Sequence, residues 1–339
     1  MRIGLFLAYW PWYSPEEQVE LAKQADREGL DSVWVSEAWG QDAATVLGHM
    51  SAVTERVGLG SGLFQIPART PAMTAMTAAT LDTLSGGRFR LGLGVSGPQV
   101  SEGWHGVSFA RPVSRTREYV EIVRAALARE GPLEYEGGEY TLPVDGTGLG
   151  KPLKLLIHPP RPDIPIYLGA IGPKAVEQTA EIADGWIPFF FNPEQGEEML
   201  APIRATGRDV DVSPAVLVCV DDDAATARDM ARPWLAIYLG GMGAKGKNFY
   251  VETAERMGHG DSARRVQELF MAGDRTGAGA AISDEIIDAC SICCRASDLD
   301  ERLAAFERAG ADTLLAMPFG DRPRIVEALA AAARGAAAS

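Results

Sequence analysis

The sequence lacks a long apolar run, and none of its hydrophobic stretches approaches the roughly 18 residues that a membrane-spanning helix needs. Positive charge is also scarce, since 32 Lys and Arg stand against 46 Asp and Glu, for a formal net charge of −14. We therefore expect neither a nucleic acid nor a membrane as partner. An anionic ligand would have to be held by backbone N–H groups and a few basic side chains.

Cysteine is rare as well, with four residues in the chain, three of them at Cys290, Cys293 and Cys294. This number does not suggest a secreted disulfide framework, so we expect the cytoplasm. No second Cys or His pair complements the three, and we read them as small buried side chains on a helix over residues 284–295 rather than as metal ligands. No nucleophile-elbow, P-loop or metalloprotease pattern is present.

What the chain does contain is an alternation of buried apolar segments and amphipathic helical patterns. Eight segments are typical of strands: residues 3–10, 32–37, 57–64, 89–96, 164–169, 186–190, 215–220 and 313–318. A helical pattern follows each strand, and Ser14, Pro15 and Glu17 form a capping box at the start of the first helix. Eight strand–helix units favour an α/β fold, a (β/α)₈ TIM barrel, with a doubly wound open sheet as the alternative. No linker divides residues 1–339, so we expect a single domain.

Two stretches depart from the alternation. Residues 131–160 contain an alternating pattern about Gly137-Gly138 and then Pro- and Gly-rich chain, which predicts a β-hairpin and loop insertion. Residues 240–282 are long and Gly-rich, and we interpret them as a partly helical insertion that acts as a lid or substrate loop over the barrel mouth.

Gly92-Leu93-Gly94-Val95-Ser96-Gly97 matches the G-x-G-x-x-G pattern of dinucleotide-binding sites. That pattern belongs on the first strand–turn–helix unit of a βαβ fold, whereas here it falls on the fourth strand. We therefore interpret Gly92 and Gly94 as small strand residues, and Ser96-Gly97-Pro98 as a loop at the strand end.

A second glycine-rich loop is better placed. Gly169-Ala170-Ile171-Gly172-Pro173-Lys174 lies between a strand and a helix, where free N–H groups and the helix dipole favour an anion. Late loops of this kind often bind phosphate in barrel enzymes. A plain tight turn is the alternative.

Three strand-end side chains are candidates for proton transfer. Glu37 follows the second strand, where an ordinary ion pair is the alternative; Tyr9 belongs to an aromatic run that equally well caps the core. His105 follows the fourth strand and has a titration range near neutral pH, although a single loop histidine is more often structural.

Several of these segments together give the chain its resemblance to a known family. The segments are Ser36-Glu37-Ala38-Trp39, Gln65-Ile66-Pro67-Ala68-Arg69-Thr70-Pro71, Leu81-Asp82-Thr83-Leu84-Ser85-Gly86-Gly87-Arg88, Gly94-Val95-Ser96-Gly97-Pro98, Glu102-Gly103-Trp104-His105-Gly106 and Ala183-Asp184-Gly185-Trp186. In this order they resemble the luciferase-like monooxygenase superfamily, and more closely its branch of oxidoreductases that use the deazaflavin coenzyme F420.

The resemblance implies a luciferase-like (β/α)₈ barrel that forms a homodimer or larger homo-oligomer, with the cofactor ring in the barrel mouth. It implies a non-proline cis peptide at Gly62–Leu63 against the ring. The expected cofactor contacts are Glu37, Gly62, Leu63, Ser96, Gly97 and Pro98, with the phosphate on Ala170, Ile171, Gly172 and Pro173. Some related dehydrogenases have a catalytic histidine where this chain has Ala38, which argues against their chemistry and leaves the proton donor open among Glu37, His105 and Tyr9.

The function that follows from the resemblance is hydride transfer from reduced F420 to a C=C or C=N bond of a small molecule. Reduction is expected because reduced F420 is a strong hydride donor that barely reacts with oxygen. The first alternative is an FMN-dependent monooxygenase on the same barrel, and the second is a non-catalytic protein that stores a flavin or deazaflavin.

Overall fold

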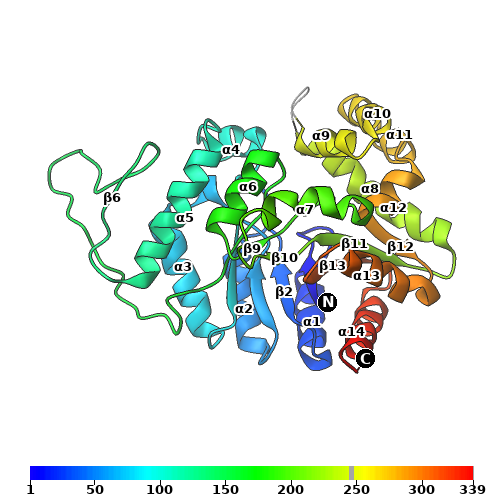
Figure 1. Ribbon diagram of the computed structural model, residues 1–339, viewed down its shortest axis with the longest axis horizontal. Helices are drawn as coiled ribbons and strands as arrows, with labels where there is room; N and C mark the ends of the chain where they lie inside the picture. Colours follow the sequence, from blue (N-terminus) through cyan, green and yellow to red (C-terminus); the bar gives the residue numbers. More distant parts are fainter. Residues whose placement is uncertain (244–247, 339) are drawn as a thin grey trace.

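The computed structural model describes residues 1–243 and 248–338 (Figure 1). Each of the eight predicted strand segments overlaps a strand of one curled parallel sheet. These strands are β1 (Arg2–Leu7), β2 (Ser32–Val35), β3 (Gly58–Ser61), β5 (Phe89–Gly94), β8 (Ile166–Leu168), β9 (Gly185–Trp186), β11 (Ala215–Val220) and β13 (Thr313–Phe319). Three short strands extend the sheet: β4 (Phe64–Gln65), β10 (Asp211–Val212) and β12 (Ser291–Cys294).

The strand order closes the sheet into a barrel. The order is β10-β9-β8-β5-β3-β2-β1-β13-β11-β12, and a parallel bridge between Phe189 and Ala215 joins the chain after β9 to β11. The Ala215 N–H donates to the Pro188 carbonyl at 2.9 Å along the same seam. The ring therefore follows the order of the chain, which confirms the barrel and excludes the doubly wound alternative.

Helices surround the barrel. The helix after each barrel strand is, in order, α1 (Pro15–Glu28), α2 (Ala43–Val53), α3 (Pro71–Leu84), α5 (Pro112–Ala128), α6 (Pro173–Ile182), α7 (Gly196–Arg204), α8 (Ala224–Gly241) and α14 (Arg322–Ala338). The capping box at Ser14 and Glu17 is present, and Gly29 ends α1 with φ 81°. Both features match the sequence pattern.

The remaining helices belong to the connections. They are α4 (Pro98–Gly103), α9 (Phe249–Arg256), α10 (Gly260–Met271), α11 (Arg275–Ala280), α12 (Asp284–Cys290) and α13 (Leu299–Arg308). Helices α9 to α11 form most of the segment 240–282 and lie together above α8 (Figure 1); its residues 244–247 lie outside the described residues. The strands β6 (Tyr135–Glu136) and β7 (Thr141–Leu142) pair as an antiparallel hairpin and project from the body beside α5 (Figure 1).

The prediction of one helix over residues 284–295 is wrong in its second half. Helix α12 ends at Cys290, and Ser291–Cys294 form β12, which pairs in parallel with β11. Tertiary pairing decides the conformation here, because the register places Cys293 opposite Cys219 on a buried edge. The four cysteines are buried and free, as small core side chains.

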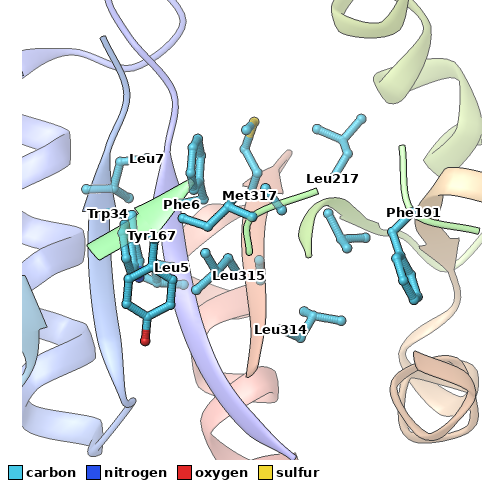
Figure 2. Close-up of a cluster of buried hydrophobic side chains, with 14 of the residues drawn as sticks. Leu5, Phe6, Leu7, Trp34, Tyr167, Phe191, Leu217, Leu314, Leu315 and Met317 are labelled. Atoms are coloured by element: carbon cyan, nitrogen blue, oxygen red, sulfur yellow. The ribbon is translucent and has the colours of Figure 1, made fainter. Parts of the chain in front are cut away.

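The core fills the barrel with side chains from several strands. Figure 2 shows members of this cluster, among them Leu5, Trp34, Tyr167 and Leu315. The rings of Trp34 and Tyr167 meet edge to face with centroids 5.0 Å apart. Gly60 makes room for Trp34, since a Cβ at this position would lie 2.3 Å from its indole. The strand interiors are thus a packed core, and only the carboxyl ends of the strands leave space for a ligand.

Within residues 1–243 and 248–338, no helix is both long and apolar enough to cross a membrane.

Candidate functional site

A cavity of about 690 Å³ opens where the strands end, a size that suits a cofactor with its substrate. The loops after β1, β2, β3, β5 and β8 line it, and residues from α8 and α9 close one side. The predicted site residues that line it are Tyr9, Glu37, Gly62, Leu63, Ser96, Gly97, Ala170, Ile171, Gly172 and Pro173. Pro98 and His105 do not line it.

The chain after β3 carries the expected cis peptide at Gly62–Leu63. Glycines seat the Leu63 side chain: a Cβ at Gly169 would lie 2.2 Å from its Cδ1, and a Cβ at Gly94 would lie 3.0 Å away. A Cβ at Gly92 would lie 2.0 Å from the Ser61 carbonyl oxygen. The literal G-x-G-x-x-G pattern is therefore explained by close packing against this loop, as the sequence interpretation expected.

The loop after β8 presents free N–H groups to the cavity. Gly172 is the N-cap of α6 and makes no side-chain capping bond. The N–H groups of Ala170, Ile171 and Gly172 have no backbone or side-chain acceptor among the described residues. Lys174 adds a positive charge on the same lining. An uncapped helix N-terminus beside a lysine is suited to a phosphate group.

The loop after β5 has an unusual backbone. Ser96 adopts φ 61°, in the left-handed region that a non-glycine residue rarely occupies, and such residues gather at ligand sites. A Cβ at Gly97 would lie 3.5 Å from the Met242 carbonyl oxygen, so the loop approaches the end of α8 closely. The cavity is therefore bounded at this point by the barrel on one side and by α8 on the other.

Glu37 is held in place by four hydrogen bonds. Its oxygens accept from Arg69 at 2.5 and 2.9 Å, from the Ala43 N–H at 3.0 Å and from the Gln65 N–H at 3.4 Å. The side chain of Glu37 is 5% exposed and that of Arg69 13%. The four donors hold the carboxylate as an ion pair that ties the loop after β2 to the chain that begins α3.

The His105 side chain contacts the cavity lining through Gln65. Its Nε2 lies 3.0 Å from Oε1 of Gln65, whose Nε2 donates to the Ala38 carbonyl at 2.7 Å. Gln65 lines the cavity, so His105 orients a cavity residue without facing the cavity itself. This arrangement corresponds to the structural alternative for a loop histidine.

Tyr9 faces the cavity with a free hydroxyl. No hydrogen bond of this hydroxyl to another described residue is present, and burial raises the pKa of Tyr9 to about 12. Tyr9 therefore keeps its proton at neutral pH and offers this O–H donor to the cavity. The oxygens of Glu37 accept from four other donors, and His105 does not line the cavity.

Ser36, Tyr238 and Tyr250 are among the polar residues of the cavity that sequence reasoning missed. The Ser36 hydroxyl is buried and lacks a partner in the part of the chain that the structure describes; such a group calls for an explanation, and a ligand supplies one. Tyr238 and Tyr250 come from α8 and α9 and also line the cavity. A local pattern does not reveal them, because only the tertiary position of these helices brings them to the barrel mouth.

Among residues 1–243 and 248–338, no group of three or more His, Cys, Asp or Glu side chains has the arrangement of a metal site. The polar groups that line the cavity are backbone N–H groups, hydroxyls, glutamine amides, Lys174 and the carboxylate of Glu37.

Comparison with known proteins gives a consistent result over most of the chain. The family described as luciferase-like monooxygenase matches residues 1–313. A protein of Mycobacterium tuberculosis, named as a coenzyme F420-dependent oxidoreductase, is 43% identical over 337 residues, which cover 96% of this chain and 97% of that protein. A 5,10-methylenetetrahydromethanopterin reductase of Archaeoglobus fulgidus is 29% identical over 331 residues, with 93% of each chain covered.

The solved structure of the coenzyme F420-dependent tetrahydromethanopterin reductase from Methanopyrus kandleri has a similar fold. The TM-score is 0.79, and the alignment covers 97% of this chain and 98% of that chain at 24% sequence identity. At this level of identity the likeness establishes the shared barrel.

Proposed function

The chain belongs to the luciferase-like monooxygenase family, and we propose that it is an F420-dependent oxidoreductase that transfers hydride from reduced F420 to a C=C or C=N bond of a small molecule. One feature of the site carries this proposal. The uncapped N-terminus of α6, with Lys174, faces the same cavity as the Gly62–Leu63 loop. The cavity therefore suits a ligand that carries both a phosphate group and a flat ring. The 43% identical relative, named for F420, supports the choice of cofactor.

The residues present fit this cofactor. The N–H groups of residues 170–172 and the Lys174 ammonium would hold its phosphate, and the Ser36 hydroxyl, without a partner otherwise, would bond a polar atom of the ring. The backbone of Gly62 and Leu63 would support one ring face, since the glycines around Leu63 hold that side chain in place. When bound, F420 supplies hydride from the C5 carbon of its deazaflavin ring.

The protein positions the reactants, excludes water and provides a proton donor. The apolar cavity wall excludes water, and the Glu37–Arg69 pair fixes the loop that carries Ser36. Of the three candidates, Tyr9 is the proton donor that we propose, because its hydroxyl faces the cavity and is not engaged. Glu37 and His105 then position the loops around the cofactor.

Reduction is the direction that we propose, with the segment 240–282 covering the substrate. Met242, Phe249 and Tyr250 of this segment line the cavity and support that role. We extend the proposal to a homodimer or larger homo-oligomer in the cytoplasm, a single barrel domain per chain; sedimentation velocity on the purified chain tests the assembly.

Titration with oxidised F420, and separately with FMN, tests the cofactor by fluorescence. Saturable F420 binding with little FMN binding is the expected result. Tight FMN binding without an F420 response would overturn the proposal and favour the alternative, an FMN-dependent monooxygenase, which the family's description supports. Oxygen consumption would then be the assay that follows.

A further inference from the structure

Three phenol groups meet at the helical side of the cavity. Tyr9 comes from the loop after β1, Tyr238 from α8 and Tyr250 from α9, and all three line the same space. The rings of Tyr238 and Tyr250 are nearly perpendicular, at 87°, with centroids 5.0 Å apart. Segments more than two hundred residues apart in the chain therefore bring these three phenols to the wall of one cavity.

None of the three hydroxyls has a hydrogen-bond partner among residues 1–243 and 248–338. Burial raises the pKa of each phenol, and the neighbouring phenols raise those of Tyr238 and Tyr250 further. At neutral pH the cluster is therefore an uncharged set of O–H donors. Unengaged donors at a partly buried site are suited to a ligand oxygen that accepts several hydrogen bonds.

The surroundings of these hydroxyls are aromatic. Trp234 packs against Tyr9 and Tyr238, with centroids 5.5 and 5.2 Å away, and Phe189 packs against Tyr238 at 4.5 Å. Among the described residues of the cavity lining, the charged side chains are Lys174, at the start of α6, and Glu37, already paired with Arg69. A flat apolar molecule with one strong acceptor matches this end of the cavity.

We propose that the hydroxyls of Tyr9, Tyr238 and Tyr250 form a binding site for the carbonyl oxygen of an apolar α,β-unsaturated ketone or aldehyde, so that the bond reduced is a C=C conjugated to C=O. This inference rests on the proposed hydride transfer and specifies its substrate class. It also makes Tyr238 and Tyr250 catalytic residues, which come from the part of the chain outside the strand-end loops.

The chemistry of this step balances with the groups present. Hydride from reduced F420 adds to the carbon β to the carbonyl and breaks the C=C π bond, and the electron pair moves through the α carbon onto the carbonyl oxygen. The phenols stabilise the negative charge that develops on this oxygen, as donors of an oxyanion site do. One phenol passes its proton to the oxygen and regains a proton from water, and the enol converts to the saturated ketone. The deazaflavin is oxidised and the enone is reduced.

The first test measures hydrogen bonding to the carbonyl without turnover. The probe is 4-phenyl-3-buten-2-one labelled with ¹³C at the carbonyl, bound to the full chain with and without oxidised F420, which has no hydride to give. We expect the carbonyl resonance of the probe bound to the wild type to lie downfield of that of the free probe. In Tyr238→Phe and in Tyr250→Phe this downfield shift should be smaller. Tyr140→Phe is the matched control, since Tyr140 is a partly buried phenol that does not line the cavity.

The second test is turnover of the same enone with reduced F420. Removing one donor of an oxyanion site lowers kcat by roughly 10²-fold, and we expect at least about tenfold here, because two donors remain. KM should change less than kcat, since the charge develops in the transition state. A Tyr→Phe variant that only disturbed packing would lower the melting temperature and leave the carbonyl resonance of the bound probe unchanged.

The inference would be overturned if the probe failed to bind, or if its carbonyl resonance were the same in the wild type and in Tyr238→Phe/Tyr250→Phe. Failure of the proposed function is separate from this result, because it would appear as the absence of F420 binding in the fluorescence titration. If the protein binds the enone through the tyrosines but does not bind F420, the proposed carbonyl site stands and the proposed cofactor is wrong.

Discussion

Replacing Gly172 by Asp should weaken binding of the cofactor phosphate at α6 without weakening the helix itself. Gly172 is the N-cap of α6, with φ −78° and ψ 150°, and an added Cβ would meet no atom within 4 Å. An N-cap Asp bonds the free N–H groups of the first turn, so the free energy of unfolding should stay equal or rise by a few tenths to about 1 kcal/mol. The carboxylate would occupy the place proposed for the cofactor phosphate.

The expected loss of affinity follows from Coulomb's law. Two like charges about 4 Å apart repel by about 1 kcal/mol in water and by about 4 kcal/mol at an effective dielectric constant of 20. Since about 1.4 kcal/mol changes affinity tenfold, the F420 dissociation constant should rise by between about 5-fold and about 700-fold. The shift should shrink as salt is added, because the site opens to solvent.

Gly172→Asn is the control for this experiment. Asn caps a helix about as well as Asp and has nearly the same shape, but it carries no charge. Fluorescence titrations of the two variants with F420, beside their thermal melts, therefore isolate the charge. Equal F420 affinities of the Asp and Asn variants would refute the placement of the phosphate at α6.

Three further predictions concern the loops and the pH dependence. Glu37→Ala leaves Arg69 without its main partner and should lower the free energy of unfolding by about 3 kcal/mol in chemical denaturation; loss of turnover at unchanged stability would instead make Glu37 catalytic. Gly92→Ala pushes a methyl group against the Ser61 carbonyl, where the gap would be 2.0 Å, and should cost about 1–3 kcal/mol in the same assay; no change would show that the loop moves freely. Because the folded-state pKa of Tyr9 is about 12 and the unfolded value 10.0, its contribution to stability is full below pH 10 and is lost as the pH rises toward 12. The stability difference between the wild type and Tyr9→Phe should fall by up to about 2 kcal/mol over this range, and a constant difference would contradict the burial of the phenol.

Much of the barrel was predictable because local and tertiary signals agree there. The strand 215–220 has the bounds that its apolar pattern predicts, since turn and capping residues close this buried segment. Residues 291–294 were missed because four buried residues between helices fit a helix or a strand equally well, and only pairing with β11 decides.

The candidate site likewise has a part that the sequence predicts and a part that it does not. The loops after β3 and β8 were predictable, because Gly62, Gly169 and Gly172 stand where backbone must approach a neighbour or a ligand. The free hydroxyls of Tyr238 and Tyr250 were not, since α8 and α9 have ordinary helical patterns and only their docking on the barrel turns these side chains to the cavity. Glu37 was ambiguous in the sequence because an ion pair and a catalytic acid use the same residue, and its four donors come from distant positions.

The seating of Leu63 among glycines has a consequence for how this enzyme tolerates change. The half of the cavity built on strand ends is locked, since a single methyl group at Gly169 would collide with Leu63. The half built from α8 and α9 rests on side chains of surface-covering helices, where exchange of one aromatic residue for another alters shape without moving a strand. Substitutions among the aromatic residues of α8 and α9 should therefore alter substrate preference and leave the proposed cofactor site intact. A library restricted to the aromatic positions of α8 and α9 should yield folded, cofactor-binding variants far more often than one directed at the strand-end loops.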